Sequence, residues 1–394
     1  MPAVCFYFQV HQPYRLKTVP FASIESDHSY FDDVKNGAVM KKVAEKCYLP
    51  TNNAMLKLIK KHGDQFKISY SITGVAIEQM QQFAPEVLDS FKRLVDTGNV
   101  ELIGETYYHS LAALYDQDEF RAQARLHREL IQRVFGVTPR VFRNTELIFN
   151  EYIGSLANSI GYETVLAEGW DDVLGWRSPN FVYKVPGSDL RLLLKNYKLS
   201  DDVAFRFSNK GWECHPLSAE TYASWIHRLS GSGDTVGLFM DYETFGEHQW
   251  ADSGIFEFLE RFPEYLLKHP DWSFLTPTEV TSKFPVVGEL PYTRLTSWAD
   301  TERDISAWRS NRMQERALHD AFELGPKLRA SGNESLLHIW RKLLTSDHFY
   351  YMCTKWFADG DVHAYFSPYD SPYEAFSFYM NTLRDFQRWI EKAL

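Results

Sequence analysis

Acidic, histidine and aromatic side chains directly follow an apolar run in the second half of the chain. Residues 235–240 (TVGLFM) lead into a polar stretch that contains Asp241, Glu243, His248 and Trp250. Charged groups at the mouth of an apolar core lose hydration, so they normally occur there only when they are paired or when a reaction needs them. Carboxyl groups in such a place can donate a proton when protonated, or attack an electrophilic carbon when ionised. The stretch therefore predicts a reactive site, provided that other parts of the chain supply partners.

Polar side chains follow four further apolar runs in the same way. In parallel β/α folds the carboxyl ends of the strands share one rim, and functional groups collect there. One buried acid, such as Glu105 or Glu168, is more readily explained as a satisfied core carboxylate. Acids and histidines at the same end of five strands instead favour a functional rim. The residues that follow the runs at 4–10, 100–104, 141–145 and 163–168 include His11, Gln12, Glu105, His109, Glu146 and Trp170.

Two carboxylates from different strands, surrounded by aromatic residues, fit glycoside cleavage better than other hydrolytic chemistries. In that reaction one carboxylate attacks the anomeric carbon while a second, protonated one donates to the leaving oxygen. No GxSxG nucleophile elbow and no HExxH pair occurs, which disfavours a serine triad and a zinc hydrolase. Convergence of His11, His109, His248 and His348 on one metal is a less favoured alternative. No DxDxDG calcium loop occurs either, so we expect no metal and no cofactor.

The elements that must position these residues alternate between short apolar strands and helices up to about residue 288. This alternation implies a parallel sheet with helical crossovers, either an incomplete TIM-like barrel or an open doubly wound sheet. Helical spacing without strands then predicts α-helices at 303–328, 334–356 and 371–393. We therefore expect two domains, a barrel over 1–288 and a helical bundle over 289–394 that contributes to the cleft. The seven strands are expected at 4–10, 67–73, 100–104, 141–145, 163–168, 189–195 and 235–241.

Composition excludes several classes of partner. The 394 residues carry a formal net charge of −10, which disfavours nucleic acid and anionic membranes. Four widely spaced cysteines without a CxxC motif argue against structural zinc and a disulfide framework, and favour reduced thiols in the cytoplasm. Residues 1–10 have no basic n-region or cleavage site, and no apolar run reaches the length of a transmembrane helix. Aromatic residues make up 15% of the chain, and many lie beside polar groups, as suits the binding of sugar rings.

Five stretches of the chain together resemble the sequence regions of glycoside hydrolase family 57. The likeness extends over nearly the whole chain, and its third and fourth stretches are the most specific. The flanking segments 199–208 and 297–314 resemble the α-amylase-like branch of the family. The five stretches are HQP (11–13), GNVELIGETYYHS (98–110), FRNTELIF (142–149), MDYETFGEH (240–248) and LLTSDHFYYM (343–352).

The resemblance implies a fold, a mechanism and a substrate. The fold is an α/β (β/α)7 incomplete TIM-like barrel with a C-terminal α-helical bundle. The mechanism is retaining, with Glu146 as nucleophile and Asp241 as general acid/base. The substrate is an α-1,4-glucan or malto-oligosaccharide, cleaved by α-amylase-like endo-hydrolysis with some transglycosylation. The alternatives are a 4-α-glucanotransferase, a branching enzyme or a non-catalytic glucan-binding protein. A further alternative is a metal-dependent deacetylase or mannosidase on a similar barrel.

Ten further residues are predicted to bind substrate. His11 is expected to hydrogen-bond a sugar hydroxyl, and Glu243 shares the strand parity of Asp241. Asp347 and His348 are expected in mid-helix, where an adjacent acid and histidine gain nothing for helix propensity. The full set is His11, Gln12, Glu105, His109, Trp170, Glu243, His248, Trp250, Asp347 and His348.

Overall fold

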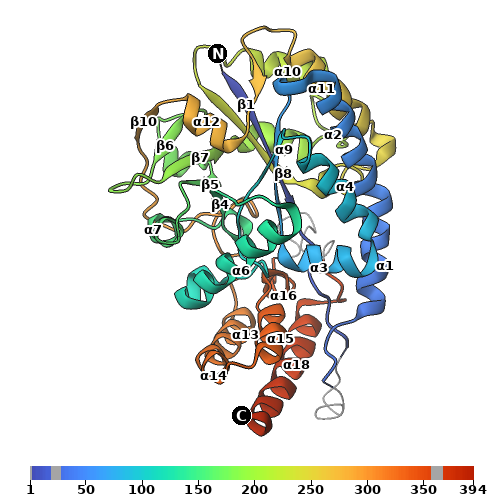
Figure 1. The fold of residues 1–394 in the computed structure, drawn as a ribbon, viewed down its shortest axis with the longest axis vertical. Coiled ribbons are helices and arrows are strands. Elements are labelled where there is room, and N and C mark those ends of the chain that lie inside the picture. Colours follow the sequence, from blue (N-terminus) through green and yellow to red (C-terminus); the bar gives the residue numbers. More distant parts are fainter. Residues whose placement is uncertain (1, 19–27, 356–366) are drawn as a thin grey trace.

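Seven parallel strands close into a barrel in the computed structural model, which describes residues 2–18, 28–355 and 367–394 (Figure 1). Hydrogen-bonded pairs run from β8 through β1 and β2 to β3, and from β4 through β5 to β7. A parallel bridge between Gly104 and Phe142 joins β3 to β4, and the pair Lys195–Gly237 joins β7 to β8. The predicted (β/α)7 fold is confirmed. The barrel strands are β1 Ala3–Val10, β2 Ile68–Ile72, β3 Val100–Leu102, β4 Val141–Arg143, β5 Thr164–Glu168, β7 Arg191–Lys195 and β8 Thr235–Asp241.

The barrel interior changes from apolar to polar along the strands. Alternate side chains point inward, and Tyr7, Val141 and Phe239 belong to one buried apolar cluster. One pleat further towards the carboxyl ends, the inward positions carry polar groups. These are Gln9 on β1, Ser71 on β2, Arg143 on β4, Lys195 on β7 and Asp241 on β8.

Helices cover the outside of the barrel. Three short strands at its periphery were not expected from the sequence: β6 Val182–Lys184 pairs antiparallel with β7, β10 Val286–Glu289 pairs with β6, and β9 Ser273–Phe274 pairs with β1. With two to four residues each, they are too short for apolar alternation to be recognised. The covering helices are α1 Asp33–Val43, α2 Leu49–His62, α3 Gly74–Phe83, α4 Pro85–Val95, α5 Ala112–Tyr115, α6 Gln117–Phe135, α7 Glu151–Ser159, α8 Asp171–Leu174, α9 Tyr197–Ala204, α10 Ala219–His227, α11 Ile255–Leu266 and α12 Pro277–Lys283.

The C-terminal helices pack at the end of the barrel opposite to the amino end of β1 (Figure 1). They are more broken than predicted. The helix expected over 303–328 begins only at Arg312, because Asn311 caps it, and a new helix starts at Gly325. The helix expected over 334–356 stops at Leu343, and residue 356 lies outside the described residues. The observed helices are α13 Arg312–Glu323, α14 Gly325–Ser331, α15 Glu334–Leu343, α16 Ser346–Tyr350 and α18 Pro372–Ala393.

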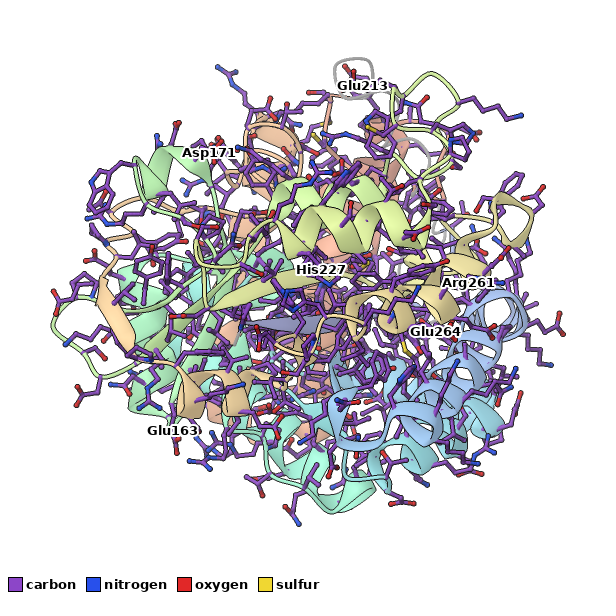
Figure 2. All side chains as sticks on the ribbon, turned by 90° about the horizontal axis from the view of Figure 1, so that it is seen from above. Glu163, Asp171, Glu213, His227, Arg261 and Glu264 are labelled. Carbon is purple, nitrogen blue, oxygen red and sulfur yellow. The ribbon has the colours of Figure 1, made fainter. Side chains whose placement is uncertain are left out.

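Buried apolar contacts connect the barrel to the C-terminal helices. Phe142 and Val165 of the barrel belong to the same buried cluster as Trp308, Trp340 and Leu337. Surface ion pairs lie on outer elements, as the positions of Glu163, Arg261 and Glu264 in Figure 2 illustrate. Within the described ranges, no helix has both the length and the apolarity that crossing a bilayer requires.

Candidate active site

Glu146 lies in a strained turn at the end of β4. The strand stops at Arg143, and Thr145–Leu147 form one 3-10 turn in which Glu146 has φ 58° and Leu147 has φ 51°. Left-handed backbone at two adjacent non-glycine residues is unfavourable and is typical of functional sites. The Ser297 hydroxyl donates to the Glu146 carbonyl at 2.8 Å and helps to hold the turn. The turn leaves the Glu146 side chain 23% exposed at the rim.

His109 bridges two carboxylates that come from different strand ends. Its Nε2 lies 2.8 Å from Glu146 Oε1, and its Nδ1 lies 3.2 Å from Glu105 Oε2. Burial opposes protonation, but hydrogen bonds and charge from Glu105 and Glu146 outweigh it and raise the pKa of His109 to about 9. The imidazolium in turn lowers the pKa of Glu146, against the opposing effect of burial. Glu146 is therefore held as a carboxylate.

Trp298 supplies a second donor to the same carboxylate. Its indole Nε1 donates to Glu146 Oε2 at 2.7 Å. Trp298 lies on the loop before α13, and its backbone N–H also donates to the Glu146 carbonyl at 3.3 Å. A hydrogen bond to an ionised acceptor is stronger than one between neutral groups. Glu146 is thus fixed from both sides, by the barrel through His109 and by the loop through Trp298.

Asp241, the last residue of β8, has the opposite electrostatic setting. Burial, and next the negative charge of Glu146, raise the pKa of Asp241 to about 6. The positive charge of Arg143 limits this rise. One acid of the rim is therefore kept ionised, while the other retains its proton into the mildly acidic range.

Glu243 lies two residues beyond Asp241 and is buried. Burial, and next the charge of Asp241, raise the pKa of Glu243 to about 8. Tyr48 donates to Glu243 Oε1, and Gln12 Nε2 donates to the same oxygen at 3.4 Å. Gln12 and Glu243 therefore form a neutral, hydrogen-bonded pair beside Asp241 at pH 7.

The helical part brings Asp347 to the barrel rim. The backbone N–H of Ser346 donates to the His109 carbonyl at 2.9 Å, which ties the start of α16 to the loop after β3. Asp347 Oδ2 then lies 2.9 Å from His11 Nε2, while Thr73 Oγ1 lies 3.0 Å from His11 Nδ1. Burial, and next the charge of His109, lower the pKa of His11. A neutral His11 can donate to Asp347 and accept from Thr73.

The rings of His11 and His109 connect the two halves of the rim. They stack with centroids 4.0 Å apart and an interplanar angle of 24°. His109 carries the positive charge and His11 stays neutral, so the stack places no two like charges in contact. The structure thus brings together eight of the sequence-predicted residues in one continuous set: Glu146, Asp241, Glu105, His109, His11, Asp347, Gln12 and Glu243.

Four predicted residues have other surroundings. His348 is buried and its Nε2 lies 3.2 Å from the Lys342 carbonyl, with its ring against Tyr379 in the helical core. Burial lowers the pKa of His248 to about 4. Trp250 is 61% exposed. The ring of Trp170 is covered by the Arg294 guanidinium at 4.2 Å.

Sequence reasoning missed several residues of the rim. Trp298 lies in the segment 297–314, for which the family resemblance implies no residue role. Arg303, on the same loop, donates to Glu168 Oε2 at 2.8 Å and to Asp201 Oδ2 at 2.7 Å. Lys195 completes this buried network, with Nζ 2.9 Å from Asp201 Oδ1. A basic residue at the last position of a barrel strand, as at Lys195, is the signal that could have found it.

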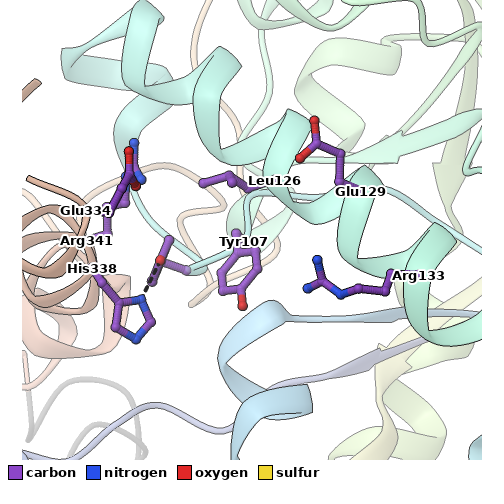
Figure 3. Close-up of a pocket in the computed structure, with 8 residues that line it drawn as sticks. Tyr107, Leu126, Glu129, Arg133, Glu334, His338 and Arg341 are labelled. Atoms are coloured by element: carbon purple, nitrogen blue, oxygen red, sulfur yellow. Dashed lines mark hydrogen bonds between the residues drawn. The ribbon is translucent and has the colours of Figure 1, made fainter. Parts of the chain in front are cut away.

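A cavity of about 270 Å³ lies between α6 and α15 and is also lined by Tyr107 and Tyr108 of the loop after β3 (Figure 3). The Tyr108 hydroxyl lies 2.8 Å from His338 Nδ1, and the Tyr107 hydroxyl donates to Glu78 at 2.8 Å. Neither Glu146 nor Asp241 lines this cavity, so it is separate from the paired carboxylates. Its lining residues are Tyr107, Tyr108, Leu126, Glu129, Arg133, Glu334, His338 and Arg341.

The described residues offer one cluster with metal-ligand atoms close together. His319, Asp320 and Glu323 lie on α13 and are largely exposed. Exposed acidic groups of this kind are common on helices, and His319 already pairs with Glu323 at 3.0 Å. This cluster is not made of residues of the rim.

Comparison with known proteins identifies relatives. Residues 5–293 match the model described as "Glycosyl hydrolase family 57". The chain is 42% identical, over a 403-residue alignment, to a Methanocaldococcus jannaschii protein named "Putative alpha-amylase", with 99% of this chain and 85% of that protein covered. The solved branching enzyme of family 57 from Thermococcus kodakaraensis has a TM-score of 0.71 at 15% identity, covering 98% of this chain and 90% of that one. A branching enzyme from Pyrococcus horikoshii has a TM-score of 0.71 at 16% identity, covering 100% and 92%. At these identities the structural likeness shows the fold.

Proposed function

The chain belongs to glycosyl hydrolase family 57 and is a glycoside hydrolase, and on that premise we propose that it cleaves α-1,4-glucans with retention of configuration. Glu146 is the nucleophile and Asp241 the general acid/base. The observation that carries the proposal is the different setting of the two carboxyl groups. Glu146 is hydrogen-bonded to His109 and Trp298, whereas burial and the charge of Glu146 raise the pKa of Asp241. Glycoside cleavage by two carboxyl groups needs one of them ionised and the other protonated at the start of the cycle, and the assignment of retention rests on the resemblance to the family.

In the first step Glu146 attacks the anomeric carbon. A bond forms between a Glu146 oxygen and C1, the bond from C1 to the glycosidic oxygen breaks, and Asp241 gives its proton to the departing oxygen. His109 and Trp298 each hold one Glu146 oxygen, so they orient the attacking group.

In the second step Asp241 acts as a base. Glu146 has lost its negative charge in the ester, which removes one of the two main causes of the raised Asp241 pKa. Asp241 then takes a proton from water, the water oxygen bonds to C1, and the ester bond breaks. A sugar hydroxyl in place of water would give transglycosylation.

Substrate binding is assigned by position along the rim. His11 and Asp347 form one wall beside His109, and Gln12 with Glu243 lies beside Asp241. These groups are suited to bind sugar hydroxyls next to the scissile bond. Trp170 and Trp250 remain candidates for stacking on more distant glucose units.

Maltoheptaose digestion tests the proposal. NMR of fresh product should show the α-anomer first, and Glu146→Gln should reduce the rate by several orders of magnitude while folding and glucan binding persist. If every product is shorter than the substrate, the enzyme hydrolyses maltoheptaose. Products longer than the substrate indicate glucanotransferase activity. An initial β-anomer would refute retention, and near-normal turnover by Glu146→Gln would refute the nucleophile.

A further inference from the structure

Arg143 is a fully buried cation at the end of β4. It has the inward parity of Val141, which packs with Tyr7 and Phe239 in the barrel interior. Its side chain is 0% exposed. None of its three guanidinium nitrogens has a hydrogen-bond partner within the parts of the chain that the structure describes. An arginine stays charged in proteins, so burying one without a paired acceptor is unfavourable.

The other cations of the rim are already committed to carboxylates. His109 contacts Glu105 and Glu146, while Lys195 and Arg303 contact the acids of their own network. Arg143 instead contacts an aromatic ring, with its Cζ 4.6 Å from the ring centroid of Trp298. The same Trp298 donates its indole N–H to Glu146.

The charge of Arg143 acts on acidic groups at several strand ends. Its positive charge lowers the pKa of Glu105 after β3, of Glu146 after β4 and of Asp241 on β8. It also opposes the strong upward effect of burial on the pKa of Tyr7 on β1. Lys195 on β7 and His109 add positive charge that acts on Asp241 in the same direction.

We propose that Arg143 is the shared counter-ion of the catalytic pair, balancing the negative charge as it moves from Glu146 to Asp241 during the cycle. This inference rests on the proposed function. Before the first step the charge is on Glu146; after Asp241 has given its proton to the leaving oxygen, the charge is on Asp241. Because Arg143 has no hydrogen-bond partner among the described residues, its N–H groups can favour either carboxylate.

Arg143 is therefore a positioning residue that acts through the two carboxyl groups. It has two effects: it supports the Trp298 ring that orients Glu146, and it stabilises ionised Asp241 so that this group can act as a base. A residue that only filled space in the barrel could support the Trp298 ring, but it would not stabilise ionised Asp241. The second effect appears in the pH dependence of the reaction.

The test compares pH profiles of Arg143→Met, Arg143→Gln and Arg143→Lys with those of the wild type. With an activated aryl α-maltoside as substrate the second step is rate-limiting, so the pH profile of kcat reports the pKa of Asp241 as a base. With maltoheptaose the pH profile of kcat/KM reports the pKa of Asp241 as an acid. A nearby opposite charge shifts a carboxyl pKa by about 1–3 units. Both neutral variants should therefore move the basic limb of kcat/KM and the acidic limb of kcat upward by about 1 unit or more. Arg143→Lys keeps the charge and should leave both limbs near their wild-type positions.

Arg128→Met is a matched control. Arg128 also lies over an aromatic ring, 4.2 Å from the centroid of Tyr162, but it lies on α6, donates to the Ile160 carbonyl at 3.0 Å and is not among the charges that act on Glu146 or Asp241. Its removal should leave both limbs in place.

Unmoved limbs in both neutral variants, or equal shifts in the lysine and neutral variants, would overturn the inference. If neither neutral variant folds, the inference is tested with Arg143→Lys alone. A displacement of the two limbs of its pH profiles by about 1 unit would show that Arg143 does not act through its charge. Failure of the proposed function is separate, since it would appear as normal turnover by Glu146→Gln.

Discussion

The bridge from Glu105 through His109 to Glu146 should make the protein less stable as the pH rises above neutrality. His109 has a pKa of about 9 in the folded state against 6.5 for an unperturbed histidine. Its folded-state pKa is raised, so its contribution to stability is fully present below pH 6.5 and is lost as the pH rises through about 9. A difference of roughly 2.5 units corresponds to about 3 kcal/mol.

Urea unfolding between pH 6 and pH 10 measures this contribution. Other groups also titrate in this window, notably Glu243 with its pKa raised to about 8, so the wild type must be compared with a reference. Glu105→Gln combined with His109→Gln is suitable, because it removes the imidazole without leaving a buried carboxylate unpaired. The wild type should lose about 3 kcal/mol relative to this variant between pH 6.5 and pH 9.5.

The refuting result is a constant difference in unfolding free energy between the two proteins across that window. It would mean that His109 is neutral at pH 7 and that Glu146 is not paired with a cation. Histidine nitrogen NMR of the native protein gives an independent reading, since an imidazolium at pH 7.5 is expected only if the bridge holds the proton.

Three further predictions concern other parts of the rim. Trp298→Phe keeps an aromatic ring but removes the 2.7 Å hydrogen bond to Glu146. Because a hydrogen bond to a charged group contributes about 1.5–3 kcal/mol, kcat/KM should fall about 10- to 150-fold with little change in Tm, and an unchanged kcat/KM would contradict this prediction. Arg303→Met leaves Glu168 without its 2.8 Å hydrogen-bond partner, so the free energy of unfolding measured in urea should fall by about 3–5 kcal/mol. A fall of less than about 1 kcal/mol would mean that this ion pair is as weak as one on the surface. Trp250→Ala removes a ring that is 61% exposed, so KM for long glucans should rise while Tm stays unchanged; a large drop in Tm with constant KM would assign Trp250 to packing.

The barrel strands were predictable because buried parallel strands are short, apolar and separated by helices. Segments such as 189–195 and 235–241 coincide closely with β7 Arg191–Lys195 and β8 Thr235–Asp241. The C-terminal part was predictable as helical, but the ends and breaks of its helices were not. Helical spacing continues across the break at Gly325, whereas the actual end of a helix depends on caps such as Asn311.

The sequence by itself determined which strand ends carry carboxylates and histidines, because side-chain parity and strand direction follow from local pattern. It therefore placed Glu146, Asp241 and His109 on one rim. Only the tertiary structure decided their protonation, since burial and the distance to other charges set a pKa and neither can be read from spacing. It also decided that a distant loop delivers Trp298 to Glu146, and that the charge of Arg143, which has no hydrogen-bond partner in the described residues, acts on both acids. Contacts between residues more than 100 positions apart depend on how the whole chain packs.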